Sequence, residues 1–197
     1  MSTSKATQEA MSPSEALKRL REGNNRFITG NGISHEYATE VSETASGQYP
    51  FAAILGCIDS RAAAEQVFDQ GIGDLFNARV AGNIVNEDVL GSLEYACKVA
   101  GAKLILVLGH TACGAVTAAC NRVELGHITS LLSKITPVVD ASGPDPVPDE
   151  VAQQNVRHSI ERIRAESSIL ASMEANKEIM IRGAMYDVAT GKVQFMD

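Results

Sequence analysis

The sequence lacks a long uncharged apolar run. Its 197 residues are 45% hydrophobic and 21% charged, and no stretch approaches the ~18 consecutive apolar residues that a membrane-spanning helix needs. These proportions are close to those of ordinary globular domains. We therefore expect a single domain over residues 1–197, with a core of normal size and no membrane partner.

The chain also lacks an excess of positive charge and an apolar leader. With 17 basic and 24 acidic residues, its formal net charge is −7, which gives no general attraction for nucleic acid or anionic lipid. The N-terminal stretch MSTSKATQEAMSPSEALKRL contains no apolar core of a secretion signal. We expect a cytoplasmic protein that has no nucleic-acid partner.

Cysteine is scarce, with four residues in the chain. A chain of this length without a secretion signal uses such cysteines for metal binding or catalysis more often than for disulfides. Cys97 and Cys120 lie among small apolar neighbours in helical segments, so we expect them to pack in the core. The chemical interest therefore falls on Cys57 and Cys113.

From Pro50 onward, short apolar runs alternate with helical patterns. This alternation is typical of a parallel α/β sheet, and Leu104–Leu108 is its clearest strand. The segments EIMIRGAMYDV and GKVQFMD, joined around Ala189-Thr190-Gly191, predict a hairpin at the sheet edge. The expected fold class is therefore α/β, with a mainly parallel central sheet flanked by helices and one antiparallel edge strand, over residues 50–197.

Helices are predicted before and after this core. Ser12 can cap a helix in which Pro13 takes the first position and Glu15 completes a capping box. We expect this N-terminal helix over residues 12–29, with a face that could pack on a partner subunit. Residues 1–11 are expected to be flexible, and a second long helix is expected over residues 150–173.

Two predicted strand ends carry residues typical of metal sites. Cys57 follows the strand AAIL, and His110 and Cys113 follow the strand LILVL. Ligands of open parallel sheets bind beyond the carboxyl ends of the strands, so neighbouring strands would bring the three side chains together. Two thiolates and one imidazole suit Zn²⁺ and leave a fourth position for water or substrate. Each residue alone is more often a buried core residue, but together they predict one catalytic zinc site.

Asp59 and Arg61 follow the first of these cysteines. As an ordinary surface ion pair they would contribute little stability. Beside a metal, the carboxylate could accept a hydrogen bond from metal-bound hydroxide and aim it at the substrate, while the arginine holds the carboxylate in place. Asp59 could instead occupy the fourth metal position and switch the site off, and the residues alone leave both states open.

The combination of Cys-x-Asp-Ser-Arg with His-x-x-Cys-Gly, with VFDQGIGDLFNARVAGN and GSLEYA between them, resembles the β-class carbonic anhydrases. The likeness is dense from Gln48 to Cys120. It implies a carbon–oxygen lyase that hydrates CO₂ reversibly to bicarbonate through hydroxide generated at one zinc ion, in a homodimer or homotetramer. By position, it implies the zinc ligands Cys57, His110 and Cys113, the catalytic pair Asp59 and Arg61, and the substrate-binding residues Gln48 and Gly114.

The chain departs from the family pattern near the first motif. Where the family usually has a valine and one or two prolines after Arg61, this chain has Ala62-Ala63-Ala64, which lack the rigidity of proline. One branch of the family has a second bicarbonate pocket with a tryptophan before the first zinc cysteine, whereas this chain has no tryptophan and has Ile54 there. The resemblance therefore implies an open, ungated site. Arg79 also matches a family feature, but a structural role is as easily read here.

Three other functions remain open at this stage. The same zinc site could hydrolyse carbonyl sulfide or carbon disulfide, which are linear electrophiles like CO₂. A metal-free hydrolase could use Cys57 as nucleophile and His110 as base, but Cys113 would then have no role. The fold could also bind zinc without catalysis.

Overall fold

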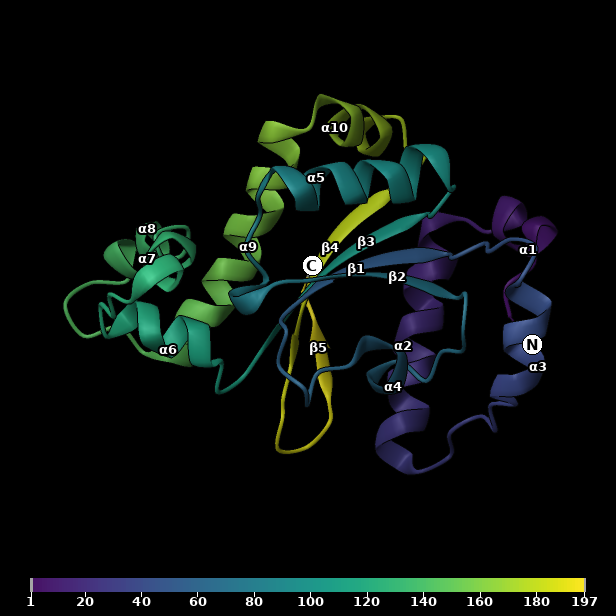
Figure 1. Cartoon of the computed structure of the whole chain (residues 1–197), viewed down its shortest axis with the longest axis horizontal. Helices are drawn as coiled ribbons and strands as arrows, with labels where there is room; N and C mark the ends of the chain where they lie inside the picture. Colours follow the sequence, from purple (N-terminus) through teal and green to yellow (C-terminus); the bar gives the residue numbers. More distant parts are fainter. Residues whose placement is uncertain (1, 197) are drawn as a thin grey trace.

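A five-stranded sheet runs through the centre of the molecule (Figure 1). The computed structural model describes residues 2–196. The strands lie in the order β2-β1-β3-β4-β5, and their bounds are β1 Ala52–Gly56, β2 Leu75–Arg79, β3 Leu104–His110, β4 Met180–Tyr186 and β5 Val193–Phe195. The pairs of β1 with β2, β1 with β3 and β3 with β4 are parallel, and β4 pairs with β5 antiparallel. The predicted fold class and edge hairpin are confirmed.

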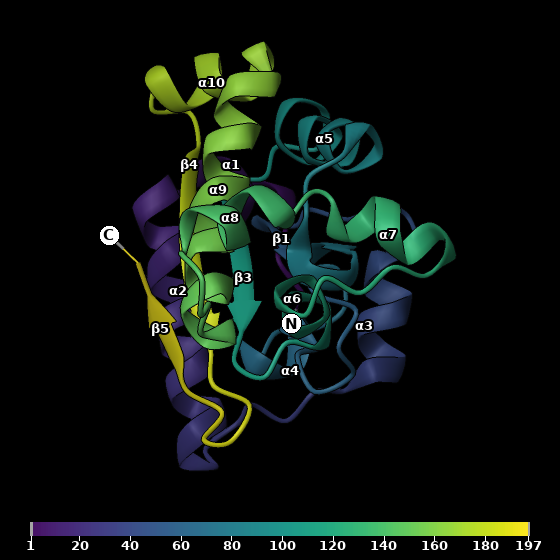
Figure 2. The same ribbon diagram turned by 90° about the vertical axis from the view of Figure 1, so that its left-hand side faces the viewer.

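Helices cover both faces of this sheet (Figure 1, Figure 2). Because successive residues of a strand point to opposite faces, Leu55 and Val107 belong to one core and Ile54 and Leu106 to the other. The first core is closed by α5 (Glu87–Glu94), α9 (Pro148–Glu166) and α10 (Ser168–Ala175), and the second by α2 (Pro13–Thr29) and α4 (Ala64–Val67). Both β1 and β3 are buried along their whole length, as expected for central parallel strands.

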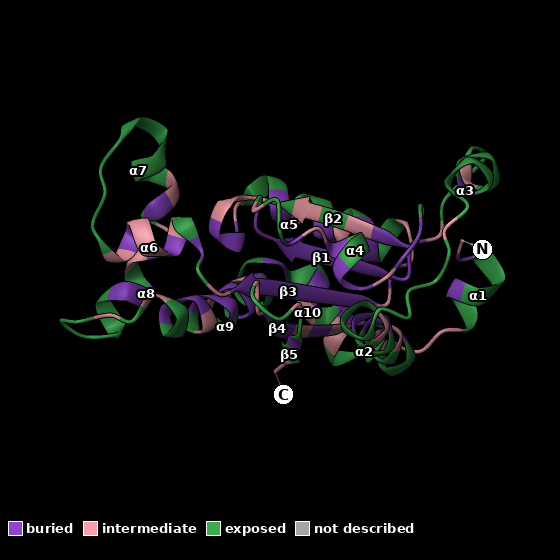
Figure 3. Ribbon diagram, turned by 90° about the horizontal axis from the view of Figure 1, so that it is seen from below, coloured by how far each residue is buried: buried purple, intermediate pink, exposed green. Residues whose placement is uncertain are grey.

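Figure 3 shows α6, α7 and α8 at one end of the molecule and α1 and α3 at the other. Their bounds are α1 Lys5–Ala10, α3 Tyr37–Thr44, α6 Gly114–Cys120, α7 Gly126–Leu132 and α8 Thr136–Ala141. Two short segments contact β1, the 3₁₀-helix η1 (Ala81–Asn83) and the π-helix η2 (Tyr95–Val99). Among residues 2–196, no helix combines the length and apolar character that a membrane crossing requires.

The N-terminal helix α2 begins as its sequence predicts. The Ser12 hydroxyl accepts a hydrogen bond from the backbone N–H of Glu15, and the Glu15 carboxylate accepts one from the N–H of Ser12. Leu20 is fully buried against the sheet of the same chain. Phe27 and Ile28 in the last turn remain 40% and 41% exposed, so the helix still presents apolar side chains outward.

Two predicted segments differ from the structure. Within residues 1–11, expected to be flexible, α1 forms, and the buried Gln8 amide donates hydrogen bonds to the carbonyls of Pro50 and Ala100. These acceptors are distant in the sequence, so no local pattern shows them. The single helix expected over residues 150–173 is two helices, because Ser167 ends α9 and its side chain caps α10 by accepting from Leu170 N–H.

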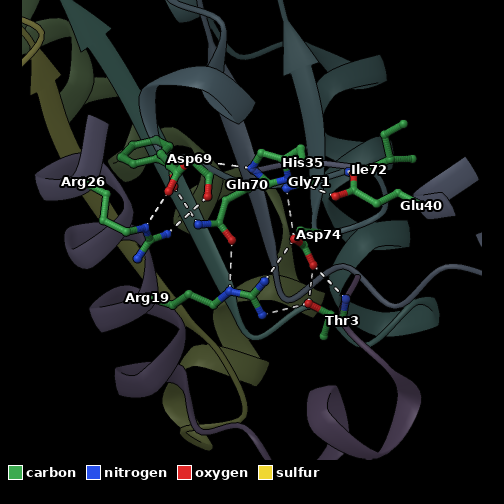
Figure 4. A network of polar contacts seen from close by, with 11 residues as sticks. Thr3, Arg19, Arg26, His35, Glu40, Asp69, Gln70, Gly71, Ile72 and Asp74 are labelled. Carbon is green, nitrogen blue, oxygen red and sulfur yellow. Dashed lines mark hydrogen bonds and ion pairs between the residues drawn. The ribbon is translucent and has the colours of Figure 1, made fainter. Parts of the chain in front are cut away.

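A buried polar network fastens α2 to the loop before β2 (Figure 4). The side chains of Asp69 and Asp74 are only 9% and 4% exposed. Arg26 pairs with Asp69, and Arg19 pairs with Asp74, whose other oxygen accepts a hydrogen bond from Thr3 N–H. Because a buried carboxylate is costly unless it is paired and hydrogen-bonded, these contacts fix the loop and the first residues of the chain against α2.

Glu40 of α3 is the third carboxylate of this network, and its side chain is 4% exposed. Its oxygens accept hydrogen bonds from the backbone N–H of Ile72, at 2.9 Å, and contact Nδ1 of His35, also at 2.9 Å. Burial alone would raise the pKa of Glu40, but these two contacts together outweigh it and place the pKa below its ordinary value of 4.5. The carboxylate therefore stabilises the fold when it is ionised.

Glu40→Gln is expected to lower the free energy of unfolding by about 1 kcal/mol at neutral pH, because hydrogen bonds to a charged acceptor become neutral ones. A carboxyl whose pKa is lowered by folding stabilises the protein above its ordinary pKa and loses this effect as the pH falls through the folded pKa. The difference between wild type and variant should therefore shrink below pH 4.5. Urea denaturation across this range measures it, with the exposed Glu43→Gln on the same helix as control. An equal difference at every pH would contradict the assignment.

Candidate metal centre

Cys57, His110 and Cys113 lie together at the carboxyl ends of two neighbouring strands. Cys57 follows the last residue of β1, His110 is the last residue of β3, and Cys113 precedes α6. β1 and β3 are adjacent and parallel, so their ends meet. One sulfur or ring nitrogen from each residue lies within 4.8 Å of the others, and all three residues are buried. The structure thus brings together the three residues that the sequence places on separate strand ends.

The ring of His110 is oriented for metal binding. Its Nδ1 lies 2.9 Å from the carbonyl oxygen of Thr111, so Nδ1 carries the proton and donates it to that oxygen. The lone pair is then on Nε2, which is buried and has no hydrogen-bond partner within residues 2–196. A buried ring nitrogen without a partner is costly, and a metal ion satisfies it.

The thiols of Cys57 and Cys113 are neighbours, and each shifts the pKa of the other. The neighbouring Cys113 thiol lowers the pKa of Cys57, burial opposes this effect, and the His110 ring and the backbone N–H of Gly82, 3.4 Å from Cys57 Sγ, add to the lowering. The same contact with Cys57, together with burial, raises the pKa of Cys113. Two adjacent thiolates are therefore stable only beside a cation, and a divalent metal ion of the zinc type fits this donor set.

Asp59 and Arg61 form an ion pair at the edge of this cluster. Arg61 holds both carboxylate oxygens, with Nε 3.0 Å from Oδ1 and Nη2 2.8 Å from Oδ2. The hydrogen bonds from Arg61 hold the pKa of Asp59 well below its usual range, although burial acts against them. Oδ2 of Asp59 is also 4.0 Å from His110 Nε2. An ionised, fixed carboxylate therefore stands beside the potential ligand atoms.

Two residues that contact the ligand loops have no local sequence signal of that role. Asp149, in the first turn of α9, accepts a hydrogen bond from the N–H of Ala112 at 2.8 Å. Ala112 has a φ of +53°, a left-handed conformation that side chains disfavour, directly before Cys113. Arg79, at the end of β2, bonds to the loop that carries Cys57. Its register opposite Gly56 in the parallel pair places it at this loop, and its match to a family feature was the signal in the sequence.

The two residues expected to bind substrate lie in different places. Gly114 begins α6 directly after Cys113, and a side-chain carbon there would meet no atom within 4 Å. Gln48 lies before β1, at the end of the strand opposite to Cys57. It lines a surface hollow of about 500 Å³ with Tyr95 and Val99, so within one chain Gln48 does not reach the cluster.

Comparison with known proteins gives consistent matches. The family model described as carbonic anhydrase matches residues 52–193. Carbonic anhydrase 2 of Mycobacterium tuberculosis is 37% identical over 193 residues, which cover 94% of this chain and 93% of the relative. The carbonic anhydrase of Mycolicibacterium smegmatis is 36% identical over 191 residues, or 92% of each chain.

Solved structures share the fold. The Coccomyxa β-carbonic anhydrase in complex with acetazolamide is 26% identical, with a TM-score of 0.72 over 95% of this chain and 87% of that one. One of two tetrameric β-carbonic anhydrases from Sordaria macrospora has the same fold at 22% identity, with a TM-score of 0.75 over 89% of this chain and 93% of that one.

Proposed function

This chain belongs to the β-class carbonic anhydrases and is an enzyme of that family, and on this premise we propose that it hydrates CO₂ reversibly to bicarbonate with one zinc ion per chain. The observation that carries the proposal is the buried Cys57-His110-Cys113 cluster with the Asp59–Arg61 pair at its edge. This donor set offers three ligands and leaves a fourth position for the reaction.

In the proposed mechanism, each residue at the site has a distinct task. Cys57 Sγ, Cys113 Sγ and His110 Nε2 would hold the zinc ion. When bound, the zinc lowers the pKa of water and supplies a nucleophile near neutral pH. Asp59 accepts a hydrogen bond from the reacting water and so turns an oxygen lone pair toward the carbon of CO₂. Arg61 fixes both oxygens of Asp59, which favours this orienting role over ligation of the metal by Asp59.

Substrate binding by Gln48 requires a second copy of the chain. β2 is an edge strand, and beside it Tyr95 and Val99 are 56% and 70% exposed. If two β2 strands met antiparallel about a two-fold axis, the beginning of one would lie beside the end of the other. Gln48 of one subunit would then approach the metal centre of its partner, where Gly114 leaves open space. The tetrameric relative supports assembly as a homodimer or homotetramer.

Mixing two impaired variants tests this arrangement. Gln48→Ala and Asp59→Asn proteins, each weakly active alone, should regain about one quarter of the wild-type activity after dissociation and reassembly together, because half of the dimers are hybrids with one intact site. The readout is CO₂ hydration before and after mixing, with size-exclusion chromatography to confirm exchange. If Gln48 acted within its own chain, no hybrid would contain an intact site and activity would stay low.

The substrate is tested by direct comparison. Zinc-loaded protein is assayed for CO₂ hydration by stopped flow and for sulfide release from carbonyl sulfide. We expect acceleration of CO₂ hydration as the main activity. Sulfide release without acceleration of CO₂ hydration would favour the carbonyl sulfide hydrolase alternative.

The proposed location is the cytoplasm. All four cysteines are free thiols, a state that the reducing cytoplasm would maintain.

A further inference from the structure

Arg79 contacts the loop of the first ligand through two backbone carbonyls. Its Nε donates to the carbonyl oxygen of Cys57 at 2.8 Å, and its Nη2 donates to that of Asp59 at 2.5 Å. These two nitrogens lie on one edge of the planar guanidinium and form a fork of parallel donors. Within residues 2–196, Arg79 forms no salt bridge, so these carbonyls are its partners.

The backbone that follows Arg79 also contacts this loop. The N–H of Val80 donates to the Gly56 carbonyl at 3.0 Å, and the N–H of Gly82 lies 3.4 Å from Cys57 Sγ. The end of β2 therefore contacts this segment at four points, two from the Arg79 side chain and two from the backbone. α9 supports this turn, because the Asn155 amide donates to the Gly82 carbonyl at 2.8 Å.

We propose that Arg79 is a positioning residue that clamps the Cys57–Asp59 loop. The clamp keeps Cys57 Sγ and the Asp59 carboxylate directed toward the same metal position. The proposal rests on the zinc-dependent hydration proposed above. The clamp matters in this loop because Ala62-Ala63-Ala64 supply no proline ring to stiffen it and Ala63 offers no side-chain cap to α4. The carbonyl of Asp59, which Arg79 holds, also accepts the N–H of Ala62 and so begins the turn into α4.

The test compares Arg79→Gln and Arg79→Lys with wild type in three measurements: the rate of zinc release to a chromogenic chelator, the thermal midpoint of the metal-free protein, and kcat for CO₂ hydration. Loss of a group that orients a metal ligand costs about 10–100-fold in metal affinity or activity. We expect Arg79→Gln to speed zinc release and to lower kcat within this range. Arg79→Lys should retain most of this defect, because an ammonium keeps the charge but lacks the fork.

The matched control is Arg162→Gln on α9. Arg162 also donates to a backbone carbonyl, that of Val85 at 2.9 Å, and pairs with Glu166 away from the cluster. It should release zinc at the wild-type rate. Three results would overturn the clamp: wild-type zinc release by Arg79→Gln, full recovery by Arg79→Lys, or a lowered thermal midpoint as the only change. If wild type itself does not hydrate CO₂, the proposed function fails, whereas zinc release still tests the clamp.

Discussion

Cys57→Ala is expected to abolish zinc binding and to reduce CO₂ hydration to the uncatalysed rate. The variant removes one of three ligand atoms that lie within 4.8 Å of one another, and the remaining thiol and imidazole are too few for a stable tetrahedral site. The measurements are zinc content per chain and stopped-flow hydration. A variant with full zinc and wild-type turnover would remove Cys57 from the site.

Cys97→Ala is the matched control for this variant. Cys97 is a core residue of η2 with 3% exposure, and burial raises the pKa of its thiol to about 12. An un-ionised thiol among apolar neighbours has no role in metal binding. Cys97→Ala should therefore keep its zinc and its activity, with only a modest loss of stability from the small cavity.

Cys113→Ala separates the zinc mechanism from the metal-free hydrolase. With Cys57 as nucleophile and His110 as base, loss of Cys113 would leave both reacting groups in place. With zinc, Cys113→Ala should be as inactive as Cys57→Ala. If Cys113→Ala hydrated CO₂ at the wild-type rate, and a thiol alkylating reagent inactivated the wild type, the metal-free reaction would be favoured.

Asp59→Asn is expected to keep a full complement of zinc and to lower kcat by about 100-fold, the scale of losing a group that positions a reacting proton. The amide has nearly the same shape, so the loop is preserved, but it presents a neutral oxygen and an N–H donor where the carboxylate offers two acceptors. Zinc analysis and stopped-flow CO₂ hydration on the same sample give the zinc content per chain and kcat.

Asp140→Asn provides the control for the loss of a charged pair. Asp140 pairs with Arg122 on the surface, where the two side chains are 59% and 54% exposed. Exposed pairs of this kind contribute little, so turnover should be unchanged. If Asp59→Asn behaved like Asp140→Asn, with full zinc and unchanged kcat, the catalytic role of Asp59 would be wrong.

Local patterns were sufficient for the central strands and for the helix start at Ser12. LILVL is short, β-branched in part, fully apolar and followed by glycine, which favours a buried strand over a helix. The ligand cluster followed from a rule of topology, because the carboxyl ends of adjacent parallel strands meet. Cys57 and His110 could therefore be expected to lie together although 53 positions separate their numbers.

Contacts between distant polar groups could not be found in the same way. The Gln8 amide bridges two carbonyls that are 42 and 92 positions away, and Asp149 holds Ala112 across 37 positions. Such hydrogen bonds depend on the placement of backbone groups in space, which no periodicity in the chain encodes. For the same reason the sequence leaves the role of Arg79 open, since both of its acceptors are backbone oxygens.

Titration of the metal-free protein with Zn²⁺, with CO₂ hydration measured at each addition, tests the central claim most directly. Activity should be at background without zinc, rise linearly and reach its plateau at one zinc ion per chain. Full activity in the metal-free protein, or one equivalent of tightly bound zinc without acceleration of CO₂ hydration, would contradict the account.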